Sequence, residues 1–197
     1  MVERNWGLIT NGATFENLAT TLVFFEDSKA ALFGRRGKDG GQDARSGDGR
    51  RVFQAKHHES HSSKSAIADA KKEAAKIRQH RDPNDSRYAQ WQGVTHWRLV
   101  TNVPFNPTDD QTWKAEVVPL FAKIGLTADY WEQANLDALL NKHPEVNRAF
   151  FENEARAFLS IPEILESLPS DEPFLRRKQL GGFIGRGDEE TSQFLAI

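Results

Sequence analysis

The sequence contains no cysteine and only one methionine among its 197 residues. Without thiols the chain can form neither disulfide bonds nor thiolate metal sites, which favours a protein of the reducing cytoplasm. It also has no apolar run near the ~20 residues that a membrane-spanning helix needs, and its N-terminal segment lacks the apolar core of a secretory signal. We therefore expect a cytoplasmic protein that does not enter a membrane.

The overall charge gives no sign of a nucleic-acid-binding protein, because the net charge is −2. This average hides a strongly basic segment, since residues 29–81 contain 14 Lys and Arg against 6 Asp and Glu. The flanking segments are acidic, with net charges of −3 over residues 1–28 and −7 over residues 82–197. The basic segment is either a phosphate-facing surface or an ordinary solvated face, and charge alone does not decide between them.

Hydrophobic periodicity predicts alternating helices and strands in a chain of ordinary globular composition, with 38% hydrophobic and 27% charged residues. The predicted helices cover residues 14–27, 63–80, 111–123 with a kink or division at Pro119, 136–141 and 145–159. The predicted strands cover residues 30–33, 42–45, 52–56, 95–101 and 126–131. Residues 82–93 and 106–110 are predicted as loops, and the Asp-Gly pair at 48–49 predicts a hairpin turn.

This order of elements predicts an α/β fold in which a mixed β-sheet is flanked by helices. We expect one domain over residues 1–159. From residue 160 onward, Pro and Gly interrupt the chain without a clear periodicity, so residues 160–197 are interpreted as a linker or tail.

Asp43, Gln54 and Lys56 form the combination with the clearest chemical meaning. Residues 54 and 56 are two apart on a predicted strand, so their side chains point to one face, and the hairpin brings Asp43 onto the neighbouring strand. A carboxylate, an amide oxygen and an ammonium group thus meet at one end of the sheet. Hard oxygens suit Mg²⁺, and a lysine beside the metal can orient water or stabilise charge that develops on phosphorus.

This arrangement resembles the PD-(D/E)xK nuclease superfamily, and within it the Mrr-like restriction endonucleases. The matching segments are the helix FENLATTLVFF, the run GKDGGQDARS, the strand VFQAKHH and the later strand WRLVTNVPF. The resemblance covers about residues 14–103. It implies a restriction-endonuclease-like fold and a DNA endonuclease that depends on Mg²⁺, with Mn²⁺ as a substitute.

The resemblance also implies roles for individual residues. It identifies Asp43 and Gln54 as metal ligands and catalytic residues, and Lys56 as a catalytic residue. Glu16 of the first helix completes the metal site in this scheme. Most of the superfamily has an acid where this chain has Gln54, so Glu16 would have to supply the second negative charge.

Basic side chains around the motif are the candidates for contact with the phosphates of double-stranded DNA, and each could equally be solvated surface. These candidates are Arg35, Arg36, Lys38, Lys64, Lys71 and Lys72. Asp39, in the Gly-rich turn, is interpreted as a turn former.

His57, His58 and His61 suggest a zinc site at first sight. Adjacent histidines on a strand face opposite ways, and no acid or cysteine completes a tetrahedral set, so we do not expect zinc. His58 lies on the same face as Lys56 and is a candidate for substrate contact.

The tail contains FIGRGDEE at residues 183–190, which resembles a run that precedes the nucleotide-binding loop of STAND-type NTPases. Antiviral STAND proteins can carry an Mrr-like nuclease at their N-terminus, so the chain is interpreted as an effector domain of such a protein, with a STAND NTPase as a partner in a longer chain. A homo-oligomer is also expected, because cutting both DNA strands usually calls for two active sites.

The sequence leaves three functions open. The first is a Mg²⁺-dependent DNA endonuclease used in defence against phage. The second is a nucleic-acid-binding or interaction module that has kept the fold and lost the chemistry, which the neutral Gln54 favours and the retained Asp43 and Lys56 oppose. The third is a ribonuclease on the same scaffold.

Overall fold

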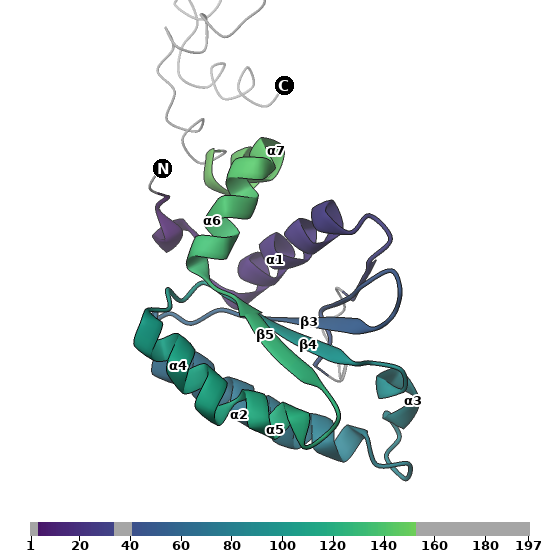
Figure 1. Ribbon diagram of the computed structural model, residues 1–197. Helices are drawn as coiled ribbons and strands as arrows, with labels where there is room; N and C mark the ends of the chain where they lie inside the picture. Colours follow the sequence, from purple (N-terminus) through teal and green to yellow (C-terminus); the bar gives the residue numbers. More distant parts are fainter. Residues whose placement is uncertain (1–3, 34–40, 153–197) are drawn as a thin grey trace, which may run out of the picture. The chain divides into compact units, whose positions relative to one another are not determined.

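The structure, a computed structural model, describes residues 4–33 and 41–152 of the chain. These residues form a five-stranded mixed β-sheet with helices on both faces (Figure 1), which confirms the predicted α/β architecture. The strands lie in chain order across the sheet: β1 Ala31–Leu32, β2 Ala44–Arg45, β3 Arg51–Lys56, β4 His96–Thr101 and β5 Thr127–Trp131. β1, β2 and β3 pair antiparallel, whereas β3, β4 and β5 pair parallel.

The helices predicted over residues 14–27 and 63–80 are confirmed, each within two residues of its expected bounds. They are α1 Gly12–Glu26 and α2 Ser63–His80. The shorter helical segments of the described chain are η1 Trp6–Leu8, α3 Tyr88–Trp91, α4 Pro107–Glu116, α5 Val118–Ala122, α6 Gln133–Lys142, α7 Pro144–Asn147 and the π-helical turn η2 Arg148–Glu152. The predicted division near Pro119 is confirmed, because α4 ends before this proline and α5 contains it.

Two segments predicted as loops are partly helical. α3 lies inside residues 82–93, and its Trp91 is buried in the core. A helix of four residues is too short to show a periodic pattern in the sequence. Residues 106–110 do not interrupt the chain but begin α4. Asn106 caps this helix and Asp109 bonds back to the Asn106 N–H, while Pro107 occupies the first position, where its missing N–H needs no partner.

The hairpin between β2 and β3 has the predicted tight turn, with Gly49 at a φ of 73°. Ala44 pairs with Phe53 across the two strands, and Asp43 directly precedes β2. The N–H of Asp43 donates to the carbonyl of Phe53 at 3.0 Å, so the ladder continues one residue beyond the strand. This register sets Asp43 beside the middle of β3.

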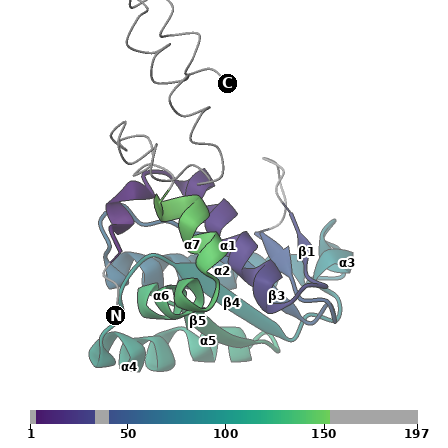
Figure 2. The ribbon, with the colours of Figure 1, turned by 90° about the horizontal axis from the view of Figure 1, so that it is seen from above.

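Two hydrophobic cores lie on opposite faces of the sheet. Val52 of β3 belongs to the core formed with α2 and α5, and Phe53 belongs to the core formed with α1 and α6. Figure 2, viewed from the side of α1, shows α1, α6 and α7 in front of the strands. Because side chains alternate along a strand, Gln54 and Lys56 share the face of Val52 and point toward α2.

The chain divides into two units after Glu152. The second unit, residues 153–197, lies outside the described residues, so the expected domain boundary at 159, the tail and its FIGRGDEE run stay predictions. Among the residues that the structure describes, every helix is too short or too polar to cross a lipid bilayer.

Candidate active site

A pocket of about 430 Å³ lies beside the hairpin of β2 and β3, and all four predicted catalytic residues line it. Glu16 comes from α1, Asp43 from the position directly before β2, and Gln54 and Lys56 from β3. The fold therefore gathers these residues from three separate parts of the chain into one wall. Their chemical roles stay predictions.

Asp43 is held at the edge between β2 and β3. Its Oδ2 accepts a hydrogen bond from the N–H of Ala55 at 2.6 Å, and the residue is 8% exposed. A hydrogen bond from a backbone N–H to a carboxylate is strong and directional, so it fixes the orientation of the Asp43 side chain. Because Ala55 stands between Gln54 and Lys56, this bond ties the carboxylate to the segment that carries the other two groups.

Gln54 has a buried oxygen that needs a partner. The residue is 3% exposed, and within the described part of the chain no group donates a hydrogen bond to its Oε1. A buried carbonyl oxygen left in this state costs about 1–3 kcal/mol. Such an atom in the wall of a pocket is well suited to a ligand that brings positive charge.

Gly41 lines the pocket beside Gln54, at a position that disfavours any side chain. Its φ of 77° is a conformation that other residues rarely adopt. A Cβ at this position would also lie 3.1 Å from Gln54 Nε2 and 3.3 Å from Glu73 Oε2. The glycine thus lets the backbone at residue 41 lie directly beside the Gln54 amide and the Glu73 carboxylate.

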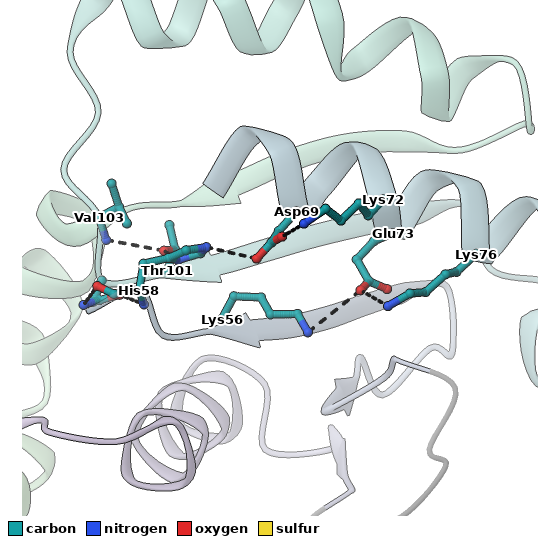
Figure 3. Close-up of polar contacts among 9 residues, drawn as sticks. Lys56, His58, Asp69, Lys72, Glu73, Lys76, Thr101 and Val103 are labelled. Atoms are coloured by element: carbon teal, nitrogen blue, oxygen red, sulfur yellow. Dashed lines mark hydrogen bonds and ion pairs between the residues drawn. The ribbon is translucent and has the colours of Figure 1, made fainter. Parts of the chain in front are cut away.

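Lys56 reaches across from β3 to Glu73 of α2 (Figure 3). Its Nζ lies 3.8 Å from Glu73 Oε1, and the Nζ of Lys76, one turn further along α2, lies 2.7 Å from the same oxygen. The side chain of Glu73 is 6% exposed, whereas that of Lys56 is 35% exposed. A buried carboxylate thus lies between two ammonium groups at the wall of the pocket.

Glu73 is the functional candidate that the sequence reading missed. It lies on the buried stripe of α2, three residues after Ala70 and four before Ile77. Glutamate is rarely buried unless it has a partner or a function, so an acid at a core position of an amphipathic helix is a readable signal. His80 and Arg87 also line the pocket and were not singled out either.

Arg87 is positioned by a short polar chain. Asp85 Oδ1 lies 3.3 Å from His80 Nδ1, and Arg87 Nη1 donates to His80 Nε2 at 3.1 Å. For both contacts to be hydrogen bonds, the neutral imidazole carries its proton on Nδ1 and accepts from the guanidinium on Nε2. This arrangement presents a permanent positive charge at the pocket.

A second depression, of about 650 Å³, adjoins the first and shares Glu16, Ala55 and Lys56 with it. Its wall includes Gly12 and Ser65, which belong to the first turns of α1 and α2. The N-termini of helices carry partial positive charge and N–H groups without helical partners, so they favour phosphate groups. Lys56 lies where the two depressions meet.

The structure describes only some of the residues that are predicted to contact phosphate. Arg35, Arg36 and Lys38, together with Asp39, lie outside the described residues, so their roles stay predictions.

On α2, the three predicted phosphate contacts do not share the pocket side. At about 100° per residue, Lys64 and Lys71 lie on roughly the opposite side of the helix from Glu73. Lys71 forms an ion pair with Glu116 of α4, and Lys72 forms one with an acid of its own helix. Their contact with nucleic acid stays a prediction, but the pocket itself is lined by other cations.

His57 and His58 face opposite sides, as predicted for adjacent residues of an extended segment. His57 lies near Phe15 of α1, whereas His58 lies between Thr101 and Asp69, with its Nδ1 3.0 Å from Thr101 Oγ1 and its Nε2 3.4 Å from Asp69 Oδ2 (Figure 3). Burial lowers the pKa of His58, although the Asp69 carboxylate opposes this effect. The threonine is fully buried, so this Thr-His-Asp arrangement is a structural network and not a hydrolase triad.

Comparison with known protein families gives no match for this chain, and none of the curated proteins is significantly similar to it in sequence.

Proposed function

We propose that the chain is a metal-dependent DNA endonuclease with a restriction-endonuclease-like fold. The observation that carries this proposal is the pocket in which Asp43, Gln54 and Lys56 meet, with a buried oxygen of Gln54 that no described group satisfies. A carboxylate, an amide oxygen and an ammonium group in one pocket suit phosphodiester hydrolysis better than acyl transfer. The depression beside it offers helix N-termini for the phosphate groups of a strand.

The residues of the pocket fit Mg²⁺. Among the described residues, no three His, Asp or Glu side chains converge closely enough to hold a metal by themselves. Mg²⁺ needs no such cage, because one or two carboxylates together with water and substrate phosphate complete its coordination. The Asp43 carboxylate and Gln54 Oε1 would hold it, with Glu16 in the same wall. When bound, Mg²⁺ supplies Lewis acidity and makes water a better nucleophile.

The chain's own side chains position the reaction and balance its charge. Water adds to phosphorus, one phosphorus–oxygen ester bond breaks, and the departing oxygen takes up a proton. The Lys56 ammonium group, at the junction of the two depressions, stabilises the negative charge that develops on the phosphate oxygens. Lys76 and Arg87 contact the phosphate backbone of the DNA next to the cleaved bond, and these contacts do not depend on the base sequence.

Double-stranded DNA is the proposed substrate, and defence against phage is the proposed use. Two copies of the domain would be needed to cut both strands, so we propose that the active form is a homo-oligomer. A C-terminal STAND NTPase in a longer protein would provide that assembly.

A cleavage assay tests the proposal. Supercoiled plasmid is incubated with the protein and Mg²⁺ or Mn²⁺, or with EDTA, beside the variants Asp43→Ala and Lys56→Ala and the matched control Lys71→Ala. We expect nicking by wild type and Lys71→Ala only, and only with metal. Cutting by both pocket variants would contradict the assignment of the site.

A silent wild type is tested again as a covalently linked dimer. If the dimer binds DNA without cutting it, the chain is the binding module that forms the alternative. A duplex RNA substrate, run in parallel, separates a ribonuclease from a deoxyribonuclease.

A further inference from the structure

The pocket lacks one negative charge where the amide of Gln54 stands. A divalent cation held by Asp43 and Gln54 would have one carboxylate and one neutral oxygen as its protein ligands. Glu73 brings a further carboxylate close to these residues, because its Oε1 lies 3.8 Å from the Nζ of Lys56. It is also 95% buried, so its charge acts with little screening by bulk water.

The two oxygens of Glu73 have different surroundings. Both lysine contacts are made to Oε1, at 2.7 Å from Lys76 and 3.8 Å from Lys56. Oε2 instead lies beside Gly41, where the Gln54 amide also ends. The carboxylate of Glu73 and the Nε2 end of the Gln54 amide therefore meet at Gly41, and the Oε1 of the same amide is the atom without a donor.

We propose that Glu73 is the second carboxylate of the metal site, so that an acid from α2 replaces the acid that β3 lacks at position 54. This inference rests on the proposed function, because it assigns a ligand within that same site. The three oxygen donors are then the carboxylates of Asp43 and Glu73 and Oε1 of Gln54. All three residues are at most 8% exposed, so little of their surface is in contact with bulk water.

The proposal has a consequence for the two lysines. Without metal, Glu73 is the counter-ion of Lys56 and Lys76. With a divalent cation bound, Glu73 would share its negative charge with the metal and would hold both ammonium groups less tightly. Lys76 stays nearby, since it lies one turn away on the same helix, whereas Lys56 comes from another element and is released toward the phosphate. Metal binding would thus free the Lys56 ammonium group to contact the phosphate.

Metal affinity, measured on the full chain without DNA, tests this assignment. Mn²⁺ is titrated calorimetrically into wild type, Glu73→Gln, Asp43→Asn and Lys76→Met. Glu16→Gln tests the competing carboxylate of the same pocket. The matched control is Glu116→Gln, which changes a carboxylate of α4 that pairs with Lys71 outside the pocket. We expect Glu73→Gln and Asp43→Asn to weaken binding at least about tenfold. Lys76→Met removes a competing positive charge and should tighten binding about threefold. Glu16→Gln should lose less affinity than Glu73→Gln, and Glu116→Gln should stay within about twofold of wild type.

Thermal unfolding without metal shows that each variant is folded before its affinity is compared. Glu73→Gln with wild-type affinity overturns the proposal, and so does Glu16→Gln with the larger loss. If Lys76→Met binds Mn²⁺ more weakly than wild type, the metal and Lys76 do not compete for the Glu73 carboxylate. These outcomes leave the proposed nuclease standing as long as Asp43→Asn loses the metal. A wild type that binds no Mn²⁺ at all removes both proposals.

Discussion

Two charged clusters lie on the same sheet and differ in how completely their members are paired. The first joins β4 and β5, where Arg98 Nε donates to Asp129 Oδ1 at 2.6 Å and its Nη2 bonds to the other oxygen. His96 lies 3.0 Å from the same carboxylate, and the guanidinium lies 4.8 Å from the ring centroid of Trp131. This cluster has a two-pronged ion pair and an aromatic surface for the cation.

The second cluster lines the candidate active site and is incompletely paired. One oxygen of Glu73 serves two lysines, and Oε1 of Gln54 has no donor within the described chain. A two-pronged ion pair that satisfies both oxygens of a carboxylate stabilises the fold, whereas a buried oxygen without a donor costs stability unless a ligand completes it. The difference favours a structural role for the Arg98 cluster, and it supports the proposal that the Glu73 cluster binds a ligand.

The largest expected effect is on catalysis. Asp43→Asn keeps the shape of the side chain and its ability to accept from Ala55, but it removes the negative charge. We expect a loss of cleavage of about 1,000-fold or more, because metal assistance is worth several kcal/mol and each ~1.4 kcal/mol changes the rate tenfold. The free energy of unfolding should change by less than about 1 kcal/mol. Plasmid nicking rates and urea unfolding measure the two quantities.

The reverse pattern is expected for the paired cluster. Arg98→Met should lower the free energy of unfolding by about 2 kcal/mol, less than for a fully buried pair, because the side chain of Asp129 is 39% exposed. Cleavage by the folded fraction should stay within about twofold of wild type, since this ion pair lies outside the pocket. Urea unfolding and nicking rates at low temperature check both. A severe loss of cleavage in a folded Arg98→Met protein would contradict a purely structural role for the Arg98 cluster.

DNA affinity separates a pocket cation from a paired surface cation. Arg87→Gln should weaken binding about tenfold, because a hydrogen bond to a charged group is worth about 1.5 kcal/mol. Lys71→Gln should have little effect, since Lys71 is paired with Glu116 on another side of α2. Fluorescence anisotropy with a duplex at several salt concentrations measures both variants. Equal losses would show that the basic segment acts as a diffuse surface.

The smallest effect is the acid sensitivity of the paired cluster. Burial opposes the ionisation of Asp129, but hydrogen bonds from Arg98 and His96 outweigh it and lower the pKa to about 2 from 3.8. The ion pair therefore stabilises the fold fully above pH ~4 and is lost as the pH falls toward 2, a loss of about 1 kcal/mol once solvent screening is allowed for. Urea unfolding between pH 5 and 2 should show a smaller acid loss in Asp129→Asn than in wild type. Parallel curves would contradict the expectation.

Local patterns in the sequence predicted the elements that carry the site. The stripe of α2, the Asp-Gly turn and the alternation of β3 each depend on neighbours a few residues apart, and each is confirmed. The hairpin also brings Asp43 next to β3, where its carboxylate accepts a hydrogen bond from the Ala55 N–H. The short helix α3 and the start of α4 were missed because a single turn or cap offers too few residues for a periodic pattern.

The chain alone thus determined the strands, the long helices and which side chains share a face, because these depend on local geometry. Only the tertiary structure decided which charges meet. Glu73 and Lys71 belong to one helix, yet one lies beside Lys56 in the pocket and the other pairs with α4. That difference depends on how α2 packs on the sheet, since an ion pair needs a separation of a few ångströms that sequence spacing does not encode.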